Sequence, residues 1–249
     1  MSYYEPKNKK ILITGAAGGI GFATASLFAA KGAVPIMVGH SDLDDLRQKA
    51  GIIESKTGIL PDCYICELSD SKSIEKTADE ILRKYGRIDI LVNNAALSLF
   101  SLAQDLEDGE LFKLTSINLL APMALCKAFI PSFLKNGSGR IINVSSMWGS
   151  VGASCESAYS ASKGGINAYT KALAKELAPS HIPVSAIAFG AVDTKMNKRL
   201  TPEEKAEFEE SIPYGRMATS EEAAEMIFNV ACAPDYMTGQ IIGFDGGYI

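Results

Sequence analysis

The stretch that decides the fold of this chain is Thr14-Gly15-Ala16-Ala17-Gly18-Gly19-Ile20-Gly21. It follows the apolar run Lys10–Thr14, which predicts a strand, and it leads into Gly19–Lys31, where apolar side chains recur on one helical face. Glycines at such a junction permit a tight turn and let the backbone approach a pyrophosphate at the helix N-terminus. The stretch therefore predicts a dinucleotide-binding turn, and a tight turn without a ligand is the alternative.

Strands and helices alternate along the rest of the chain. The further predicted strands are Val34–Val38, Cys63–Cys66, Ile88–Val92, Arg140–Val144, Val184–Ala188 and Gln240–Gly243. The further predicted helices are Asp42–Lys56, Ser71–Tyr85, Glu107–Leu134 with a bend near Pro122, Cys155–Ala178, Pro202–Glu210 and Ser220–Cys232. This alternation predicts an α/β fold, a doubly wound seven-stranded parallel sheet with helices on both faces. Without an evident linker or repeat, we expect residues 1–249 to form a single domain.

Composition narrows the class of protein. The chain has 249 residues, of which 47% are hydrophobic and 21% charged, so it can bury a substantial core. Its formal net charge is −5 and it has no basic stripe, which argues against nucleic acid as a partner. No apolar run approaches the roughly 20 residues of a membrane span, and the N-terminus does not resemble a secretory signal. We therefore expect a cytoplasmic protein without a membrane partner.

The sequence offers little to a metal or to histidine-based chemistry. Cys63 and Cys66 form a Cys-x-x-Cys, but on a strand residues three apart point to opposite faces, and no second pair completes a zinc site. The two histidines, His40 and His181, fall in predicted loops away from the expected catalytic end. A zinc dehydrogenase or a Ser-His-Asp hydrolase therefore lacks its essential residues, and we expect no metal.

Tyr159 and Lys163 are candidates for proton transfer. They are four residues apart on a predicted helix, so they share one face. A nearby cation favours the phenolate and lowers the pKa of a tyrosine, which would suit a proton donor to a carbonyl under reduction. Such a pair also occurs on ordinary helices as a packing pair, so its weight depends on the other motifs.

Those motifs together resemble the classical short-chain dehydrogenase/reductase family over nearly the whole chain. The residues that carry the resemblance, in chain order, are Thr14-Gly15-x-x-x-Gly19-x-Gly21, Asn93-Asn94-Ala95-Ala96, Asn118, Ser146, Tyr159-x-x-x-Lys163, Gly190, Val192, Thr194 and Thr238-Gly239…Asp245-Gly246-Gly247. The chain departs from the family pattern at Ala96, where the family has glycine, at Phe189, where it has proline, and at Glu67, where it often has aspartate.

The resemblance implies a Rossmann fold and an NAD(P)-dependent oxidoreductase acting on carbonyl or alcohol groups. It implies that Tyr159 is the acid or base, that Lys163 tunes it and binds the nicotinamide ribose, that Ser146 polarises the carbonyl, and that Asn118 holds a relay water. Ser145 is assigned no catalytic role. The cofactor-binding residues it implies are Gly15, Gly18, Gly19, Ile20, Gly21, His40, Ser41, Glu67, Leu68, Asn94, Ala95, Tyr159, Lys163, Gly190, Val192 and Thr194.

The choice between NAD and NADP depends on the end of the second predicted strand. An acid there would bind the ribose 2′-hydroxyl, whereas a base would favour a 2′-phosphate. The chain has Gly39 at the usual acid position and His40 at a position that is often basic in NADP users, so NADP is the preferred expectation. Gly18 is uncharged where many NADP users have Arg or Lys, and His40 as a plain surface histidine is the alternative.

Two stretches are expected to line the substrate cleft, Leu97–Asp105 and Met147–Glu156, with Lys195–Tyr214 as a lid. Trp148 and Glu156 could together hold a cationic substrate group. The alternative is that Glu156 stabilises a helix N-terminus and Trp148 packs in its loop.

By overall similarity the chain resembles 3-oxoacyl-[acyl-carrier-protein] reductases. Gly137 and Ser180 stand where those reductases usually carry arginines for an acidic carrier, although Lys135 and Arg140 are near. The alternatives are a reductase of a cationic ketone such as the aminopentanone modification of elongation factor P, a sugar or alcohol dehydrogenase, and a non-catalytic NAD(P)-sensing protein. The family also implies a homotetramer, with the two longest predicted helices at a subunit interface.

Overall fold

The computed structural model describes residues 5–194 and 201–249. Its strands are β1 (Lys10–Thr14), β2 (Val34–Gly39), β3 (Asp62–Ile65), β4 (Ile90–Asn93), β5 (Arg140–Ser146), β6 (Val184–Phe189) and β7 (Ile241–Phe244). Its α-helices are α1 (Gly19–Ala30), α2 (Leu43–Thr57), α3 (Ser71–Tyr85), α4 (Asp108–Thr115), α5 (Ala121–Asn136), α6 (Trp148–Val151), α7 (Ser157–Leu177), α8 (Pro202–Ser211) and α9 (Ser220–Ala231). A π-helical turn, η1 (Ser116–Leu120), joins α4 to α5, and a 3₁₀ turn, η2 (Ala178–Ser180), follows α7.

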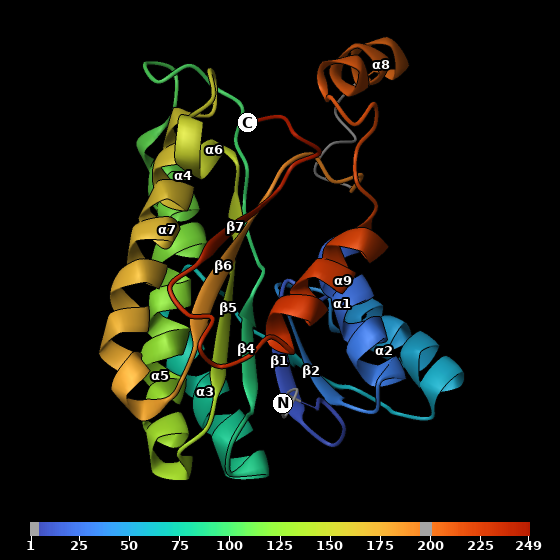
Figure 1. The fold of residues 1–249 in the computed structure, drawn as a ribbon, viewed down its shortest axis with the longest axis vertical. Coiled ribbons are helices and arrows are strands. Elements are labelled where there is room, and N and C mark those ends of the chain that lie inside the picture. The colour runs from blue at the N-terminus through green and yellow to red at the C-terminus, as the bar shows by residue number, and fades with distance from the viewer. Residues whose placement is uncertain (1–4, 195–200) are drawn as a thin grey trace.

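The strands form one seven-stranded sheet in the order β3-β2-β1-β4-β5-β6-β7, and all neighbours pair in parallel (Figure 1). The predicted doubly wound α/β fold is confirmed. The order reverses between β1 and β4, which are adjacent although β2 and β3 separate them in sequence. A crevice opens at such a reversal, beyond the carboxyl ends of the strands, and ligands of open α/β sheets bind there.

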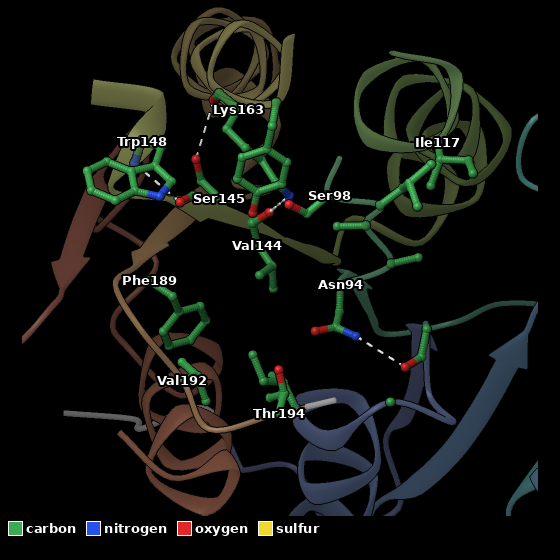
Figure 2. Close-up of a pocket in the computed structure, with 18 of the residues that line it drawn as sticks. Asn94, Ser98, Ile117, Val144, Ser145, Trp148, Lys163, Phe189, Val192 and Thr194 are labelled. Atoms are coloured by element: carbon green, nitrogen blue, oxygen red, sulfur yellow. Dashed lines mark hydrogen bonds between the residues drawn. The ribbon is translucent and has the colours of Figure 1, made fainter. Parts of the chain in front are cut away.

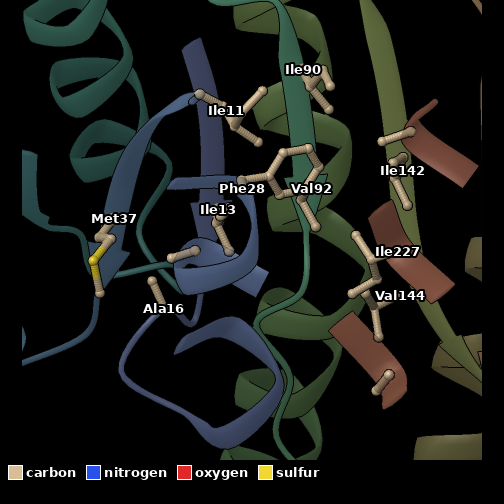
Figure 3. Close-up of a cluster of buried hydrophobic side chains, with 14 of the residues drawn as sticks. Ile11, Ile13, Ala16, Phe28, Met37, Ile90, Val92, Ile142, Val144 and Ile227 are labelled. Carbon is tan, nitrogen blue, oxygen red and sulfur yellow. The ribbon is translucent and has the colours of Figure 1, made fainter. Parts of the chain in front are cut away.

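Helices cover both faces of the sheet (Figure 1). On one face, α1, α2 and α9 pack through a core that includes Phe28, Leu46 and Ile227 with the sheet residues Ile13 and Val92 (Figure 3). On the other face, α3, α5 and α7 bury a second set of side chains, among them Ile81, Phe129, Phe133 and Leu173. Burial on both faces explains why the strands are continuous apolar runs rather than alternating ones.

The predicted helix Glu107–Leu134 is a composite. Its interruption is the π-turn Ser116–Leu120, not a simple bend at Pro122, which lies in the first turn of α5. A proline has no N–H to donate to the preceding turn, so the hydrogen-bond ladder is already broken where α5 begins. The other boundaries shift less: α7 begins at Ser157 rather than Cys155, and β3 ends at Ile65.

The stretch Asp108–Asn136 corrects the expectation that no segment is long and apolar enough for a membrane span. By length and apolar composition it could cross a membrane, and it is the one such helix among residues 5–194 and 201–249. Polar residues interrupt the stretch, so it contains no long unbroken apolar run, although its mean hydropathy is high. Phe129 and Phe133 on this helix are fully buried against the sheet, as in the core helix of a globular domain.

The cysteines lie apart from one another in the fold and remain reduced. Cys63 packs against the core on one side of the sheet, whereas Cys66 is buried in the core on the other side, so the two thiols point apart as predicted. All five cysteines are free thiols. Within the described part of the chain, no group of three or more His, Cys, Asp or Glu side chains is placed to hold a metal ion.

Candidate active site at the carboxyl ends of the strands

A cavity of about 960 Å³ lies at the carboxyl ends of the strands, where the strand order reverses (Figure 2). A cavity of this size is large enough for a dinucleotide together with a small substrate. The site residues named from the sequence that line it are Gly15, Gly18, Gly19, Ile20, Gly21, His40, Leu68, Asn94, Ala95, Ser146, Trp148, Glu156, Tyr159, Lys163, Gly190, Val192 and Thr194. Ser41, Glu67 and Asn118 are not in the lining.

The turn between β1 and α1 is packed so tightly that side chains are excluded from it. Gly15 has a φ of +65°, and a Cβ on Gly21 would lie 2.3 Å from the carbonyl oxygen of Gly15. The side-chain amide of Asn94 donates to the carbonyl of Thr14 at 2.8 Å, and the Thr14 hydroxyl accepts from the backbone N–H groups of Asn94 and Ala95. Helix α1 begins at Gly19 without a side-chain cap.

These features fit a dinucleotide cofactor. Its pyrophosphate needs backbone amides at a helix N-terminus and no side chain in the way, which the uncapped start of α1 and the glycine turn provide. Thr194 lies close to the same turn, because a Cβ on Gly19 would be 3.2 Å from the Thr194 methyl group. The segment that carries Val192 and Thr194 is held by a bridge between Val192 and Ala218.

His40 and Glu67 meet at the far end of the cavity, beyond β2 and β3. The His40 ring Nε2 lies 2.8 Å from the Glu67 carboxylate, and both side chains are about half exposed. The other Glu67 oxygen accepts from the backbone N–H and the hydroxyl of Ser69. These hydrogen bonds lower the pKa of Glu67 to about 2, so its carboxylate is charged across the physiological range.

Tyr159 and Lys163 lie on the buried face of α7, with exposed fractions of 9% and 2%. The Lys163 ammonium is 5.7 Å from the centre of the Tyr159 ring and donates to the carbonyl of Val144 at 2.8 Å (Figure 2). Ser146, at the end of β5, lines the same part of the cavity, and its hydroxyl lowers the pKa of the Tyr159 phenol. The helix spacing and the parallel pairing of the sheet thus bring three polar groups together at one point of the cavity.

The neighbouring hydroxyl, Ser145, has a different environment. It donates to the side chain of Asn167 at 2.7 Å. It also lies 3.4 Å from the carbonyl of Lys163 (Figure 2), so it ties β5 to α7. Of the two serines, Ser146 is therefore the one that contacts the phenol of Tyr159.

Burial is the largest influence on the pKa values of Tyr159 and Lys163. Burial, with a smaller contribution from the Glu156 carboxylate, raises the pKa of Tyr159 to about 12, against the opposing effect of the Ser146 hydroxyl. Burial lowers the pKa of Lys163 to about 8. The phenol is therefore protonated at neutral pH and ready to donate, while the lysine keeps most of its charge only below about pH 8.

Asn118 stands one layer behind this cavity, in the π-turn η1. Its amide oxygen accepts from the backbone N–H of Leu97 at 2.7 Å, and its amide nitrogen donates to the Leu97 carbonyl and to the Ser162 hydroxyl. The wider π-turn directs this side chain at the loop after β4, and π-turns recur at functional sites. Asn118 thereby fixes the strand end from which the cavity wall at Ser98 continues.

The outer half of the cavity is built from loops. The Ser98 hydroxyl donates to Glu156 at 2.7 Å, which joins the loop after β4 to the start of α7. The Trp148 ring stacks edge-to-face on Tyr248, with centroids 5.6 Å apart, and Tyr248 also contacts Phe208 of α8. Phe208 itself lines the cavity.

Sequence reasoning had not singled out Lys113 and Ile117, which line the cavity, or Tyr248, which packs behind the lining rings of Trp148 and Phe208. No local pattern marks them, because each takes its place only through the folded path of the chain. Of the expected lid, Lys195–Tyr214, residues 195–200 lie outside the described residues. The described remainder includes α8, whose Lys205 pairs with Asp193 at 2.8 Å beside the segment of Val192 and Thr194.

Comparison with known proteins agrees with this architecture. Residues 9–205 match the model of the short chain dehydrogenase family. The chain is 36% identical to the uncharacterized oxidoreductase YmfI of Bacillus subtilis, covering 97% of this chain and 99% of that protein. It is also 36% identical to the 3-oxoacyl-[acyl-carrier-protein] reductase FabG of Thermotoga maritima, covering 98% of both chains.

A solved structure gives the same result. A putative NAD(P) dependent gluconate 5-dehydrogenase from Beutenbergia cavernae, with NADP bound at low occupancy, superimposes with a TM-score of 0.90 at 32% identity over 99% of each chain. The family match covers most of the chain, and these relatives align over their full lengths. The chain belongs to the short chain dehydrogenase family and is an NAD(P)-dependent oxidoreductase.

Proposed function

We propose that this protein is a carbonyl reductase, reversible as an alcohol dehydrogenase, in which Tyr159 transfers the proton. The observation that carries the proposal is the buried contact of the Tyr159 phenol with Ser146, with the Lys163 ammonium 5.7 Å from its ring, at the wall of the cavity. A carbonyl held at this point meets two hydroxyl groups, one of which can give up its proton. The NAD(P) cofactor supplies the hydride when bound.

The roles of the side chains follow from their contacts. The Ser146 hydroxyl, on the same cavity wall as the phenol, positions the substrate oxygen beside it. As negative charge develops on that oxygen, Tyr159 donates its proton to it, and the nearby Lys163 charge stabilises the resulting phenolate. Asn118 holds the loop at Leu97, and its proposed role in the reaction is to hold a water of the proton relay.

For the cofactor, the glycine turn would hold the pyrophosphate, with Asn94 and Ala95 beside it. Gly190, Val192 and Thr194 would approach the nicotinamide, and NADP is preferred over NAD. His40 at the adenosine end supports that preference, since it lines the cavity and can carry a positive charge. The segment at α8 would act as the lid. Its Phe208 faces the cavity, and its Lys205 pairs with Asp193.

The preferred substrate is a 3-oxoacyl group on a carrier protein. FabG reductases from several bacteria align with this chain at 31–36% identity over nearly its full length. Phe100, Ile117 and Phe208 give the outer cavity apolar walls that an acyl chain can contact.

A ketone that carries an amine, such as the aminopentanone on elongation factor P, is the second candidate. One observation favours it: the Glu156 carboxylate lines the cavity near Tyr159, held by Ser98, with the Trp148 ring on the same wall. A carboxylate next to an aromatic face binds organic cations. A sugar acid or alcohol is the third candidate substrate, because the chain is similar to a putative gluconate 5-dehydrogenase.

Turnover of NADPH with a panel of ketones tests the proposal. The panel is an acetoacetyl carrier protein, an amino-ketone, a neutral ketone of the same size and a keto sugar acid. We expect one class to be reduced and the Tyr159→Phe variant to lose at least about a hundredfold in kcat/KM. Tight NADPH binding without turnover of any ketone would instead indicate an NAD(P)-sensing protein.

The Glu156→Gln variant separates the first two substrate classes. If the amino-ketone is the substrate, this variant loses activity toward it and keeps its activity toward the neutral ketone. Equal effects on both ketones would contradict the cation site and leave the carrier-bound substrate as the candidate.

We further propose a homotetramer, in which α4, α5 and α7 meet their copies. The helical stretch Asp108–Asn136 carries exposed apolar side chains, among them Phe112 at 71%, Leu120 at 53% and Leu134 at 47% exposure. Such a surface on one helical element is typical of a subunit contact. Native mass spectrometry of the purified protein tests the subunit number.

A further inference from the structure

The end of β2 has no acidic side chain to meet an adenosine ribose. Gly39 occupies the place, and a Cβ there would lie 3.2 Å from a methyl group of Leu46 and 3.6 Å from Ile65. The side chains of Leu46 and Ile65 therefore leave little room for a side chain at the end of β2. The carboxylate by which many members of such folds bind a 2′-hydroxyl and oppose a 2′-phosphate is missing from its usual strand.

The neighbouring strand supplies a carboxylate instead. Parallel pairing sets Gly39 beside Ile65, and the backbone N–H of Cys66 donates to the Gly39 carbonyl at 2.9 Å. Glu67 follows directly after Cys66, and its carboxylate reaches the His40 ring at 2.8 Å. The acid thus stands beside His40, a cavity-lining side chain at this end that could receive a phosphate.

The position of this carboxylate is well defined. Its two oxygens are held by the Ser69 N–H at 3.0 Å, the Ser69 hydroxyl at 2.7 Å and the His40 ring. The Glu67 backbone N–H in turn donates to the Ser73 hydroxyl of α3 at 2.9 Å. Three hydrogen bonds to an ionised group keep it charged and fix its direction.

We propose that Glu67 is a specificity-determining residue, whose carboxylate competes with the 2′-phosphate of NADP for His40 and so limits the preference for NADP over NAD. The inference rests on the proposed placement of the adenosine ribose at the end of β2. His40 with Glu67 has no net positive charge even when the ring is protonated. A 2′-phosphate must displace the carboxylate from the ring or lie next to it, and both cost binding free energy.

The remaining charges near the pair do not compensate for it. Asp42 caps α2 two residues after His40, and the basic side chains that follow, Arg47 and Lys49, pair with Asp44 and Asp45. Asp70 caps α3 on the Glu67 side. An uncharged 2′-hydroxyl tolerates this acidic surrounding, so NAD keeps its affinity where NADP loses some.

Fluorescence titration of the folded full chain with NADPH and NADH tests the proposal, and needs no substrate. In Glu67→Gln we expect the ratio of NADPH to NADH affinity to rise by about tenfold, since removal of one charge near a phosphate is an effect of that order. NADH affinity should change little, because glutamine still offers a carbonyl oxygen to a hydroxyl. His40→Ala added to Glu67→Gln should remove most of the gain for NADPH.

Glu75→Gln is the matched control. Glu75 is an exposed acid on α3, and the substitution removes the same charge without touching His40. An unchanged affinity ratio in Glu67→Gln, or an equal rise in Glu75→Gln, would overturn the proposal. Both outcomes leave the proposed reduction at Tyr159 standing, whereas a failure of that reaction would leave the affinity ratios as expected.

Discussion

The two walls of the cavity are built in opposite ways. The glycine turn is contiguous in sequence and made of backbone, and its constraint is space: a single methyl on Gly21 would overlap the Gly15 carbonyl. The wall at α7 is made of side chains and its constraint is charge, since the Lys163 ammonium is buried with the Val144 carbonyl as its hydrogen-bond acceptor. The glycines are therefore compatible with a stable fold, because any side chain in the turn would be crowded out. The buried lysine lowers the stability of the fold, and we attribute its presence to function.

Lys163→Met has the largest expected effect on activity and tests the role of charge in the wall at α7. Activity on any ketone should fall by at least about a hundredfold, because the phenol of Tyr159 loses the cation beside it. The cost of the buried charge should appear in the pH dependence of stability. The folded-state pKa of Lys163, about 8, lies below its ordinary 10.5, so the folded wild type releases this proton first as pH rises.

Between those pKa values the unfolded chain binds more protons, so the wild type gains stability with rising pH relative to the variant. From pH 8 to pH 9 we expect that relative gain to be about 1 kcal/mol in urea unfolding. Lys171→Met, an exposed lysine on the same helix, is the control and should show no such gain. A constant difference between Lys163→Met and the wild type over that range would mean that the ammonium is not buried as described.

Gly21→Ala tests the glycine turn. It should lower the stability of the fold, whereas Lys163→Met removes a buried charge that lowers stability. The added Cβ would lie 2.3 Å from the Gly15 carbonyl and 2.9 Å from the side-chain amide of Asn94, so the turn must open. We expect a loss of about 1–3 kcal/mol in the free energy of unfolding and a drop of at least tenfold in NADPH affinity. Urea unfolding and fluorescence titration measure the two, and wild-type affinity would show that no cofactor approaches this turn.

The same contrast explains what the sequence could predict. The turn lies within eight consecutive residues, and Tyr159 and Lys163 are one helical turn apart, so local spacing was sufficient for both. The alternation of apolar runs likewise determined the order of strands and helices, because each run has to bury its own face.

What the sequence could not predict depends on contacts between distant segments. Ser98 meets Glu156 across 58 residues, and Trp148 meets Tyr248 across the last hundred. The pairing of His40 with Glu67 likewise follows from the register of β2 and β3 and from the path of two loops. The π-turn at Asn118 was missed because apolar spacing cannot distinguish one widened turn from a continuous α-helix.

Gly51→Ala has the smallest expected effect and tests whether glycine is sterically required only at the cavity. Gly51 lies inside α2, away from the cavity, and a Cβ there would meet nothing within 4 Å. Alanine loses less conformational freedom than glycine in a helix, so Gly51→Ala should raise the free energy of unfolding by about 0.5–1 kcal/mol. NADPH affinity should stay at its wild-type value. If this variant were destabilised as strongly as Gly21→Ala, the steric argument would fail, because the two positions differ in the space around them and not in residue type.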